Sequence, residues 1–123
     1  RWQLSNTQVV LDFIQAWNDR DWDAIEAAFT DDAVYHNIPL QPAEGKAAAM
    51  AIIRGMRPES VDWKVLHIAE SGNAVLTERV DDMVMQGGKA VSLPVMGTME
   101  IEDGKIRAWR DYFDLASFQT QVQ

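Results

Sequence analysis

The spacing of apolar residues changes about halfway along the chain. In the first part they recur every three or four positions, which indicates amphipathic helices. From Val61 onward, apolar runs alternate with turn residues, which indicates strands. Helices followed by a meander of strands are typical of an α+β domain. We therefore expect the helices to pack on one face of a curved, mostly antiparallel sheet.

Capping and turn residues set the limits of these elements. Ser5 forms a capping box with Gln8, Gly55 is a helix stop, and Pro39 ends the extended segment before it. The expected helices are 6–18, a short one capped by Asp21 and ended by 31–32, and about 46–54. The expected strands are 33–37, 61–69, 74–85, 89–101 and 105–114, the last four joined by turns at 71–73, 86–88 and 102–104.

Composition narrows the class of protein. The chain has 123 residues, 47% of them hydrophobic, which is enough for one domain over 1–123 with a real core. It has no cysteine, which excludes disulfides and thiolate sites, and no apolar run of about 18 residues that would span a membrane. A net charge of -8 without a basic run argues against nucleic acid and anionic membranes. A small neutral ligand and a cytoplasmic location are expected.

The most informative stretch is 109–114, which reads as a strand. Side chains alternate between the faces of a strand, so Trp109, Asp111 and Phe113 share one face. An ionised carboxylate between two large apolar rings is costly unless it is paired. Asp111 is therefore expected to have a cationic partner, a shifted pKa, or both.

Turn lengths indicate which residues lie opposite Asp111. If 102–104 is a three-residue loop, Val95 faces Asp111. The same register gives two further pairs, Leu93 with Phe113 and Gly97 with Trp109. A two-residue turn would instead shift the pairing by one and bring Met96, Thr98 and Glu100 to the Asp111 side. The three-residue loop is preferred because it gives one continuous apolar face.

A second loop brings an arginine into the same row. If 86–88 is also a three-residue loop, Arg79 lies opposite Val95 and Asp81 opposite Leu93. Arg79 and Asp111 are then separated by roughly 10 Å between Cα atoms, so one guanidinium could bind both carboxylates. A structural ion network is one interpretation, and an acid and base of different pKa is the other. The second is favoured because buried ion pairs add little stability.

Tyr35 and Asn37 share one face of the segment 33–37 and could hold a water molecule. On these residues alone, the simpler interpretation is a half-buried aromatic and a turn residue before a proline. His36 and His67 lie far apart in the chain and match no metal-ligand spacing, so no metal site is expected.

Four segments, 34–39, 77–81, 104–106 and 109–114, together resemble the limonene-1,2-epoxide hydrolase family, a branch of the NTF2-like (SnoaL-like) superfamily. The resemblance covers nearly the whole chain and implies a cone-shaped α+β fold with a mixed sheet. It also implies a set of catalytic residues, namely Asp81, Arg79, Asp111, Tyr35 and Asn37. The chain departs from the family at His36, where the limonene enzyme has glutamine, and at Asp82, an added acid.

The resemblance further implies a one-step reaction without metal or cofactor. Water adds to a small hydrophobic epoxide to give a vicinal diol, with Asp111 as general base, Asp81 as general acid and Arg79 between them. The expected substrate contacts are Leu93, Val95, Trp109, Phe113, Phe118 and Met83. The family's dimerisation through the sheet suggests a homodimer, with Tyr112, Ile106 and Val80 expected on the far face.

Two other classes of function stay open. A proton-transfer enzyme of the same superfamily, such as a ketosteroid isomerase or polyketide cyclase, would usually keep its carboxylate free of a strong cationic clamp. A non-catalytic binder of a small apolar ligand would be stabilised by that ligand without turning it over.

Overall fold

The computed structural model describes residues 4–123, and it contains the expected helices and strands in the expected order. The elements are α1 (Asn6–Asn18), α2 (Trp22–Ala28), β1 (Phe29–Asn37), β2 (Ala43–Glu44), α3 (Lys46–Met56), β3 (Ser60–Ser71), β4 (Ala74–Val84), β5 (Ala90–Glu102), β6 (Lys105–Tyr112) and α4 (Leu115–Val122). The capping box is present in part, because Ser5 Oγ accepts a hydrogen bond from the Gln8 amide at 3.1 Å. Neither the short β2 nor α4 was expected.

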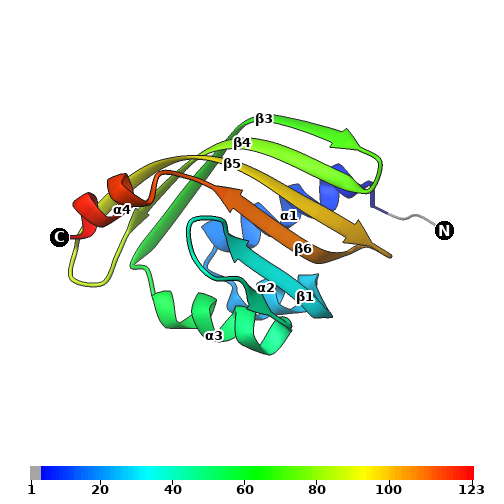
Figure 1. The fold of residues 1–123 in the computed structure, drawn as a ribbon, viewed down its shortest axis with the longest axis horizontal. Helices are drawn as coiled ribbons and strands as arrows, with labels where there is room; N and C mark the ends of the chain where they lie inside the picture. The colour runs from blue at the N-terminus through cyan, green and yellow to red at the C-terminus, as the bar shows by residue number, and fades with distance from the viewer. Residues whose placement is uncertain (1–3) are drawn as a thin grey trace.

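The strands form one six-stranded sheet in the order β2-β1-β6-β5-β4-β3. β1 and β6 run parallel, and every other neighbouring pair is antiparallel. Figure 1 shows the sheet bending over α1, with α3 next to β1 at the lower edge. The predicted α+β architecture, with helices against a curved and mostly antiparallel mixed sheet, is therefore confirmed.

The second helix ends earlier than predicted, at Ala28 instead of 31–32. Phe29 already belongs to β1, pairs with Ile106 and is fully buried. Its ring packs edge-on against Phe13 at 5.4 Å. Burial of this ring against the sheet outweighs the helical spacing of the apolar residues before it.

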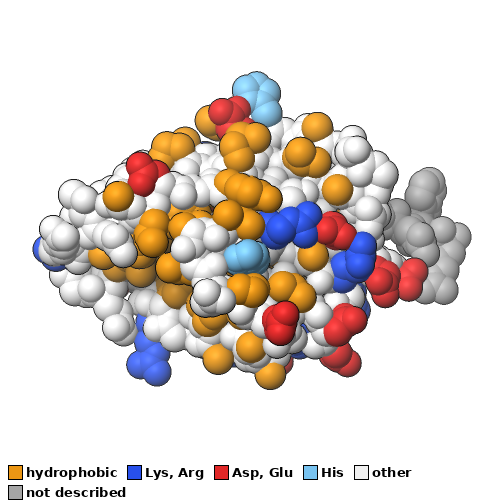
Figure 2. Space-filling view, in the orientation of Figure 1, with side chains coloured by type: hydrophobic (Ala, Val, Ile, Leu, Met, Phe, Trp, Pro, Cys, Tyr) orange, Lys and Arg blue, Asp and Glu red, His pale blue; other side chains and the backbone are white. Residues whose placement is uncertain are grey.

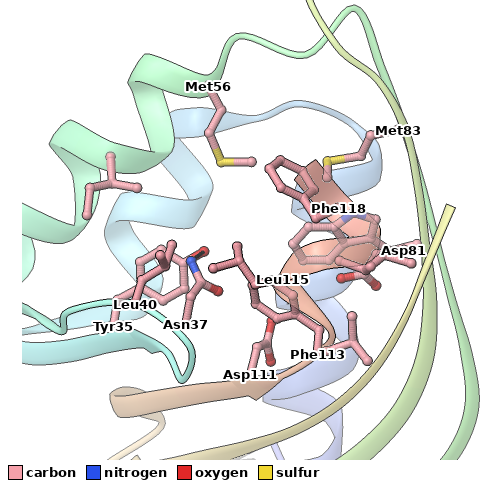
Figure 3. Close-up of a pocket in the computed structure, with 14 residues that line it drawn as sticks. Tyr35, Asn37, Leu40, Met56, Asp81, Met83, Asp111, Phe113, Leu115 and Phe118 are labelled. Atoms are coloured by element: carbon pink, nitrogen blue, oxygen red, sulfur yellow. Dashed lines mark hydrogen bonds between the residues drawn. The ribbon is translucent and has the colours of Figure 1, made fainter. Parts of the chain in front are cut away.

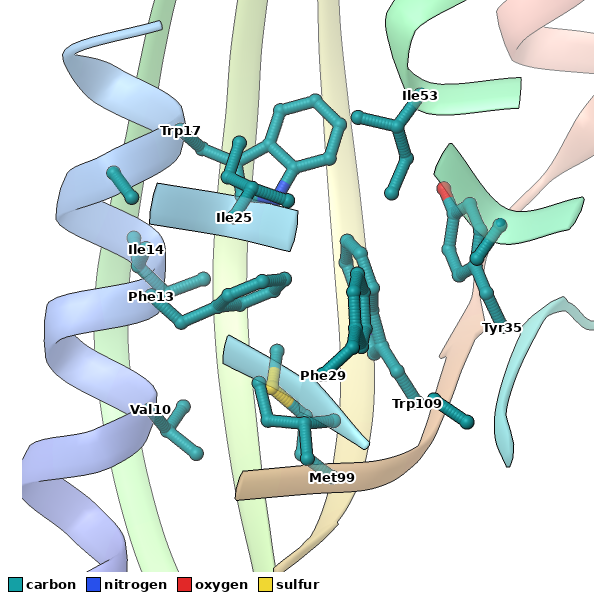
Figure 4. Close-up of a cluster of buried hydrophobic side chains, with 14 of the residues drawn as sticks. Val10, Phe13, Ile14, Trp17, Ile25, Phe29, Tyr35, Ile53, Met99 and Trp109 are labelled. Atoms are coloured by element: carbon teal, nitrogen blue, oxygen red, sulfur yellow. The ribbon is translucent and has the colours of Figure 1, made fainter. Parts of the chain in front are cut away.

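Aromatic side chains fill the space between α1 and the sheet (Figure 4). Trp109 lies at the centre of this cluster with none of its surface exposed. The ring of Phe13 meets it edge-on at 5.1 Å, and Tyr35 stacks on it at 4.4 Å. Truncating such a residue typically costs about 3–5 kcal/mol, so this cluster fixes the position of β6.

The turn before β6 differs from the preferred prediction. Asp103 and Gly104 both have positive φ angles, of 50° and 77°, and form a two-residue hairpin turn. A bulge then shifts the pairing of β5 and β6 by one more residue, so that Gly97, not Val95, lies opposite Asp111. Because the total shift is two residues, Asp111 still points to the predicted face.

Because of the same bulge, one residue that was expected on the outer face of the sheet lies in the core instead. Ile106 was expected there, but it precedes the bulge and lies in the core with no exposed surface. Tyr112 follows the bulge and is on the outer face, 49% exposed, while Val80 on β4 is half-buried. One extra residue in a strand reverses which side the residues before it face.

Helix α4 packs where β5 has no neighbouring strand. The last residue of β5 to pair with β6 is Met96, so Ala90–Val95 lack a partner on that side. The side-chain amide of Gln121 replaces it, accepting from Ser92 N at 2.7 Å and donating to Ser92 O at 3.0 Å. Among the helices described, none combines the length and apolar character needed to cross a membrane.

Candidate active site

Arg79 on β4 uses all of its side-chain N–H groups within the protein. Nε and Nη2 donate to the two oxygens of Asp81 at 3.0 and 2.8 Å. Nη1 and Nη2 donate to the two oxygens of Asp111 at 3.2 and 2.8 Å. The remaining hydrogen on Nη1 points to Thr77 Oγ1 at 3.1 Å. The predicted contact of one guanidinium with both carboxylates is confirmed, although through a different register.

Burial makes the two carboxylates depend on this arginine. Arg79, Asp81 and Asp111 are 1%, 4% and 4% exposed. Burial opposes the positive charge of Arg79, but the two carboxylates outweigh it and raise the pKa of the guanidinium. Arg79 therefore stays charged. Its guanidinium carbon Cζ lies 5.1 Å from the ring centre of Trp63, which is a cation–π contact.

Asp81 holds a proton more readily than an ordinary aspartate. Burial raises its pKa, the hydrogen bonds and charge of Arg79 lower it, and the negative charge of Asp111 raises it, so that it comes to about 6. An aspartic acid with such a pKa can donate a proton near neutral pH.

Asp111 also accepts a hydrogen bond from its own strand. Trp109 Nε1 donates to Asp111 Oδ1 at 2.8 Å, in addition to the two bonds from Arg79. Trp109 was expected to contact substrate, but it is fully buried behind Asp111 and does not line the cavity. Its ring belongs to the aromatic core instead, because that core occupies this part of the concave face.

Tyr35 and Asn37 reach the site through the parallel pairing of β1 and β6. In this register Tyr35 lies beside Trp109 and Asn37 beside Asp111. Asn37 Nδ2 donates to Tyr35 Oη at 3.0 Å, which leaves the phenol hydrogen free to donate elsewhere. Burial, together with the charge of Asp111, raises the pKa of Tyr35, so the phenol stays neutral.

These polar groups border an otherwise apolar cavity of about 190 Å³. Figure 3 shows Tyr35 and Asn37 on one side, Asp81 on the other and Asp111 at the base between them. Five of the six expected contact residues line it, namely Met83, Leu93, Val95, Phe113 and Phe118. The other apolar residues that line it, which were not among the expected contacts, are Leu40, Ile52, Met56, Trp63 and Leu115, from the loop after β1, α3, β3 and α4. Such side chains carry no sequence signal, because the packing of helices on the sheet brings them together.

The two histidines lie outside this cavity. His36 Nε2 is 3.0 Å from the carbonyl of Leu40, and His67 Nδ1 is 2.8 Å from Glu78 Oε1. Within residues 4–123, no group of three or more histidine, aspartate or glutamate side chains is arranged to hold a metal ion.

Comparison with known proteins gives two matches that are both described as epoxide hydrolases. The chain is 36% identical over 104 residues to the epoxide hydrolase EphG of Mycobacterium tuberculosis, and the matched region covers 84% of this chain and 69% of the relative. The solved structure of an M. tuberculosis LEH-like epoxide hydrolase matches with a TM-score of 0.84 and 33% identity, over 95% of this chain and 88% of that one.

More distant structures share the fold alone. A putative SnoaL-like polyketide cyclase from Shewanella putrefaciens has a TM-score of 0.85 at 11% identity, covering 98% of both chains. An NTF2-like protein from Cytophaga hutchinsonii has a TM-score of 0.79 at 24% identity, over 97% of this chain and 98% of that one. These similarities place the chain in the NTF2-like fold class.

The family model described as the limonene-1,2-epoxide hydrolase catalytic domain matches residues 4–123. That match covers the whole length that the structure describes, and it includes the strands that bring Arg79 to the two aspartates. Together with the mycobacterial relatives, it shows that the chain belongs to the limonene-1,2-epoxide hydrolase family and is an epoxide hydrolase of that type.

Proposed function

We propose that the protein adds water directly to a small hydrophobic epoxide and releases a vicinal diol. The observation that carries this proposal is the buried Arg79, which binds two carboxylates at the base of an apolar cavity. One of these, Asp81, has the raised pKa of a proton donor, and the other lies beside Asn37, whose amide donates to Tyr35 Oη. An acid and a base separated by one fixed cation are suited to opening an epoxide in a single step.

In this mechanism Asp111 removes a proton from a water molecule held by the phenol hydrogen of Tyr35 and the amide oxygen of Asn37. The water oxygen forms a bond to one epoxide carbon while the bond from that carbon to the ring oxygen breaks. The ring oxygen takes the electron pair and accepts the proton of Asp81. The diol leaves, and a proton must pass from Asp111 to Asp81 before the next turnover.

Arg79 fixes the two carboxylates in this mechanism without contacting the substrate. Its N–H groups are already donated to Asp81, Asp111 and Thr77, so none is left for the epoxide oxygen. Holding both reacting groups in place before the substrate binds lowers the entropic cost of the reaction. No covalent ester between enzyme and substrate is formed.

The walls of the cavity favour an apolar epoxide. Leu93, Val95 and Phe113 line it, and Figure 3 shows Phe118 and Met83 above Asp111. Apolar walls exclude bulk water and so favour the single positioned water as the nucleophile. Charged epoxides would lose their hydration without gaining a partner and are expected to be poor substrates.

A panel of cyclic and linear epoxides, with chiral analysis of the diols, tests this proposal. Wild-type protein should form diol from apolar epoxides, and Asp111→Asn should abolish nearly all of it. Asp103→Asn is the matched control, because Asp103 is an exposed turn residue with a positive φ of 50° that asparagine tolerates. Exchange of solvent hydrogen into an enolisable ketone without diol formation would favour the isomerase class. Ligand-induced stabilisation without any product would favour a binding module.

We also propose that the protein forms a homodimer through the outer face of the sheet. This face exposes Leu76, Met96 and Tyr112 by 42%, 51% and 49%. Figure 2 shows apolar side chains gathered across the middle of the face. Sedimentation should give a dimer for the wild type and a monomer for Met96→Lys, whereas a monomeric wild type would contradict this proposal.

A further inference from the structure

Thr77, Gly97 and Asp111 lie directly opposite one another across β4, β5 and β6. Arg79 is not in this row, because its own partner on β5 is Val95. Its side chain must therefore lean along the sheet to reach Asp111. The guanidinium passes over Gly97 on the way, between Thr77 on one side and Asp111 on the other.

Gly97 leaves the space in which Arg79 and Asp111 meet, because it has no side chain. A Cβ atom at this position would overlap Asp111 Oδ1 and would lie 2.7 Å from Arg79 Nη1. Both of these atoms are buried and hydrogen-bonded to each other, so neither can move aside without loosening that contact. The backbone of Gly97 pairs regularly in β5 and does not have a positive φ, so conformational freedom is not the reason for glycine here.

Thr77 completes the set of acceptors around the guanidinium. It is 2% exposed, and its Oγ1 accepts the Nη1 hydrogen that neither aspartate takes. The other four guanidinium hydrogens are donated to the carboxylates of Asp81 and Asp111. A guanidinium that turned toward one of these carboxylates would lose its bond to Thr77 and leave a buried N–H without a partner, so the hydroxyl of Thr77 opposes this rotation.

We infer that Gly97 and Thr77 are positioning residues for epoxide hydrolysis: Gly97 provides the slot in which Arg79 meets Asp111, and Thr77 fixes the orientation of the guanidinium within it. Neither residue contacts the substrate, because neither lines the cavity. The inference rests on the roles proposed above for Arg79, Asp81 and Asp111. It adds that the spacing of these groups is set by two neutral residues.

Gly97→Ala tests the slot, with Gly55→Ala as the matched control. A Cβ at Gly55 meets no atom within 4 Å, so the control should keep wild-type turnover. Gly97→Ala should push Asp111 and Arg79 apart and lower kcat by about 100-fold, since a displacement of about 1 Å at a reacting group has that effect. The Michaelis constant for the epoxide should stay near the wild-type value. The alkaline limb of the pH–rate profile should move to higher pH, because a displaced Arg79 lowers the pKa of Asp81 less.

Thr77→Val tests the orientation and does not depend on the outcome at Gly97. Valine has the shape of threonine without the acceptor, so one Arg79 hydrogen would lose its partner and kcat should fall roughly tenfold. Thr77→Ser restores the acceptor and should restore most of the turnover. Thr30→Val is the control, because Thr30 Oγ1 also hydrogen-bonds an aspartate, Asp32 at 2.9 Å, but far from the site.

These variants distinguish a positioning role from a structural one. A structural role would reduce only the folded fraction, leaving kcat per folded molecule and the pH–rate profile of the remaining enzyme unchanged. The inference is overturned if Gly97→Ala and Thr77→Val, measured per folded molecule, keep wild-type kcat and pH dependence. If Asp111→Asn and Arg79→Lys also keep wild-type activity, the proposed mechanism itself is wrong. If those two lose activity while Gly97→Ala and Thr77→Val do not, only the present inference is wrong.

Discussion

Arg79 and Asp81 are separated by one residue on β4, and Nε and Nη2 of the arginine donate to both oxygens of the aspartate. The two residues share a face because side chains alternate along a strand. Arg79 favours the ionised form of Asp81, whereas burial, the largest single influence, and the charge of Asp111 favour the protonated form, and the pKa is raised to about 6. An acid with a raised pKa is therefore held next to a permanent cation, and this relationship determines how activity and stability depend on pH.

Turnover is expected to fall as the pH rises through about 6, because Asp81 loses the proton that it donates to the epoxide oxygen. The measurement is kcat against pH between about 4 and 9, using one epoxide at saturating concentration. A flat profile across this range would exclude Asp81 as the group that limits the alkaline side.

The free energy of unfolding should also depend on the titration of Asp81 and should fall as the pH rises. An aspartate in an unfolded chain titrates near 3.9, below the folded value of about 6. The raised pKa therefore contributes stability that is complete below about pH 4 and is lost as the pH rises through about 6. Denaturant unfolding of wild type and Asp81→Asn across this range should show the wild type losing stability relative to the variant. An opposite slope would mean that Asp81 is ionised in the folded protein.

Asp111→Asn should lower kcat by about 100- to 10,000-fold, because the amide cannot accept the proton of the attacking water. Asparagine has nearly the same size as aspartate, so the hydrogen bond from Trp109 and the packing around it can be retained. The variant should therefore still bind apolar ligands, which a thermal-shift titration with a diol product would detect. Loss of binding together with loss of turnover would point to misfolding instead of loss of a base.

Tyr35→Phe should reduce kcat roughly tenfold, a smaller loss than at Asp111. The substitution removes the donor to the attacking water and leaves Asn37 Nδ2 without its acceptor. Stacking on Trp109 is unchanged, so the melting temperature should shift little. Activity equal to that of the wild type would show that Tyr35 only packs against the core.

Phe118→Ala should raise KM roughly tenfold for an apolar epoxide, with a smaller effect on kcat, because it removes apolar wall far from the reacting atoms. Phe118 joins α4 to a small apolar cluster with Val91, Leu93 and Val95. Leu66→Ala is a suitable control, since Leu66 is 51% exposed and does not line the cavity. The assignment would be contradicted if Phe118→Ala changed KM no more than Leu66→Ala does.

Much of this site could be predicted from alternation and turn length. The three-residue loop at 86–88 is correct, since Met85 N donates to Lys89 O at 2.8 Å, and it places Arg79 opposite Val95 as expected. The turn at Asp103 was misjudged because Asp-Gly fits both loop lengths. The bulge that follows has no sequence signal, yet it restores the predicted face of Asp111.

Other features depend on tertiary packing that local patterns do not encode. Trp109 shares a face with Asp111, as alternation predicts, but the concave face holds the core at one end and the cavity at the other. Helix α4 packs against the part of β5 that has no strand beside it. The sequence does not show where that part begins, because it depends on the residue at which β6 ends. Gly97 and Thr77 were not expected at the site, because the observed pairing of β5 with β6, which brings Gly97 opposite Asp111, matches neither of the two turn lengths considered.

The central claim is that water attacks the epoxide without a covalent ester. A single turnover in heavy-oxygen water, with enzyme in excess, tests it most directly. Mass spectrometry should find the label in the diol and none in the protein. Label in the carboxylate of Asp111 or Asp81, with an unlabelled diol, would show nucleophilic attack by the enzyme and contradict the proposed mechanism.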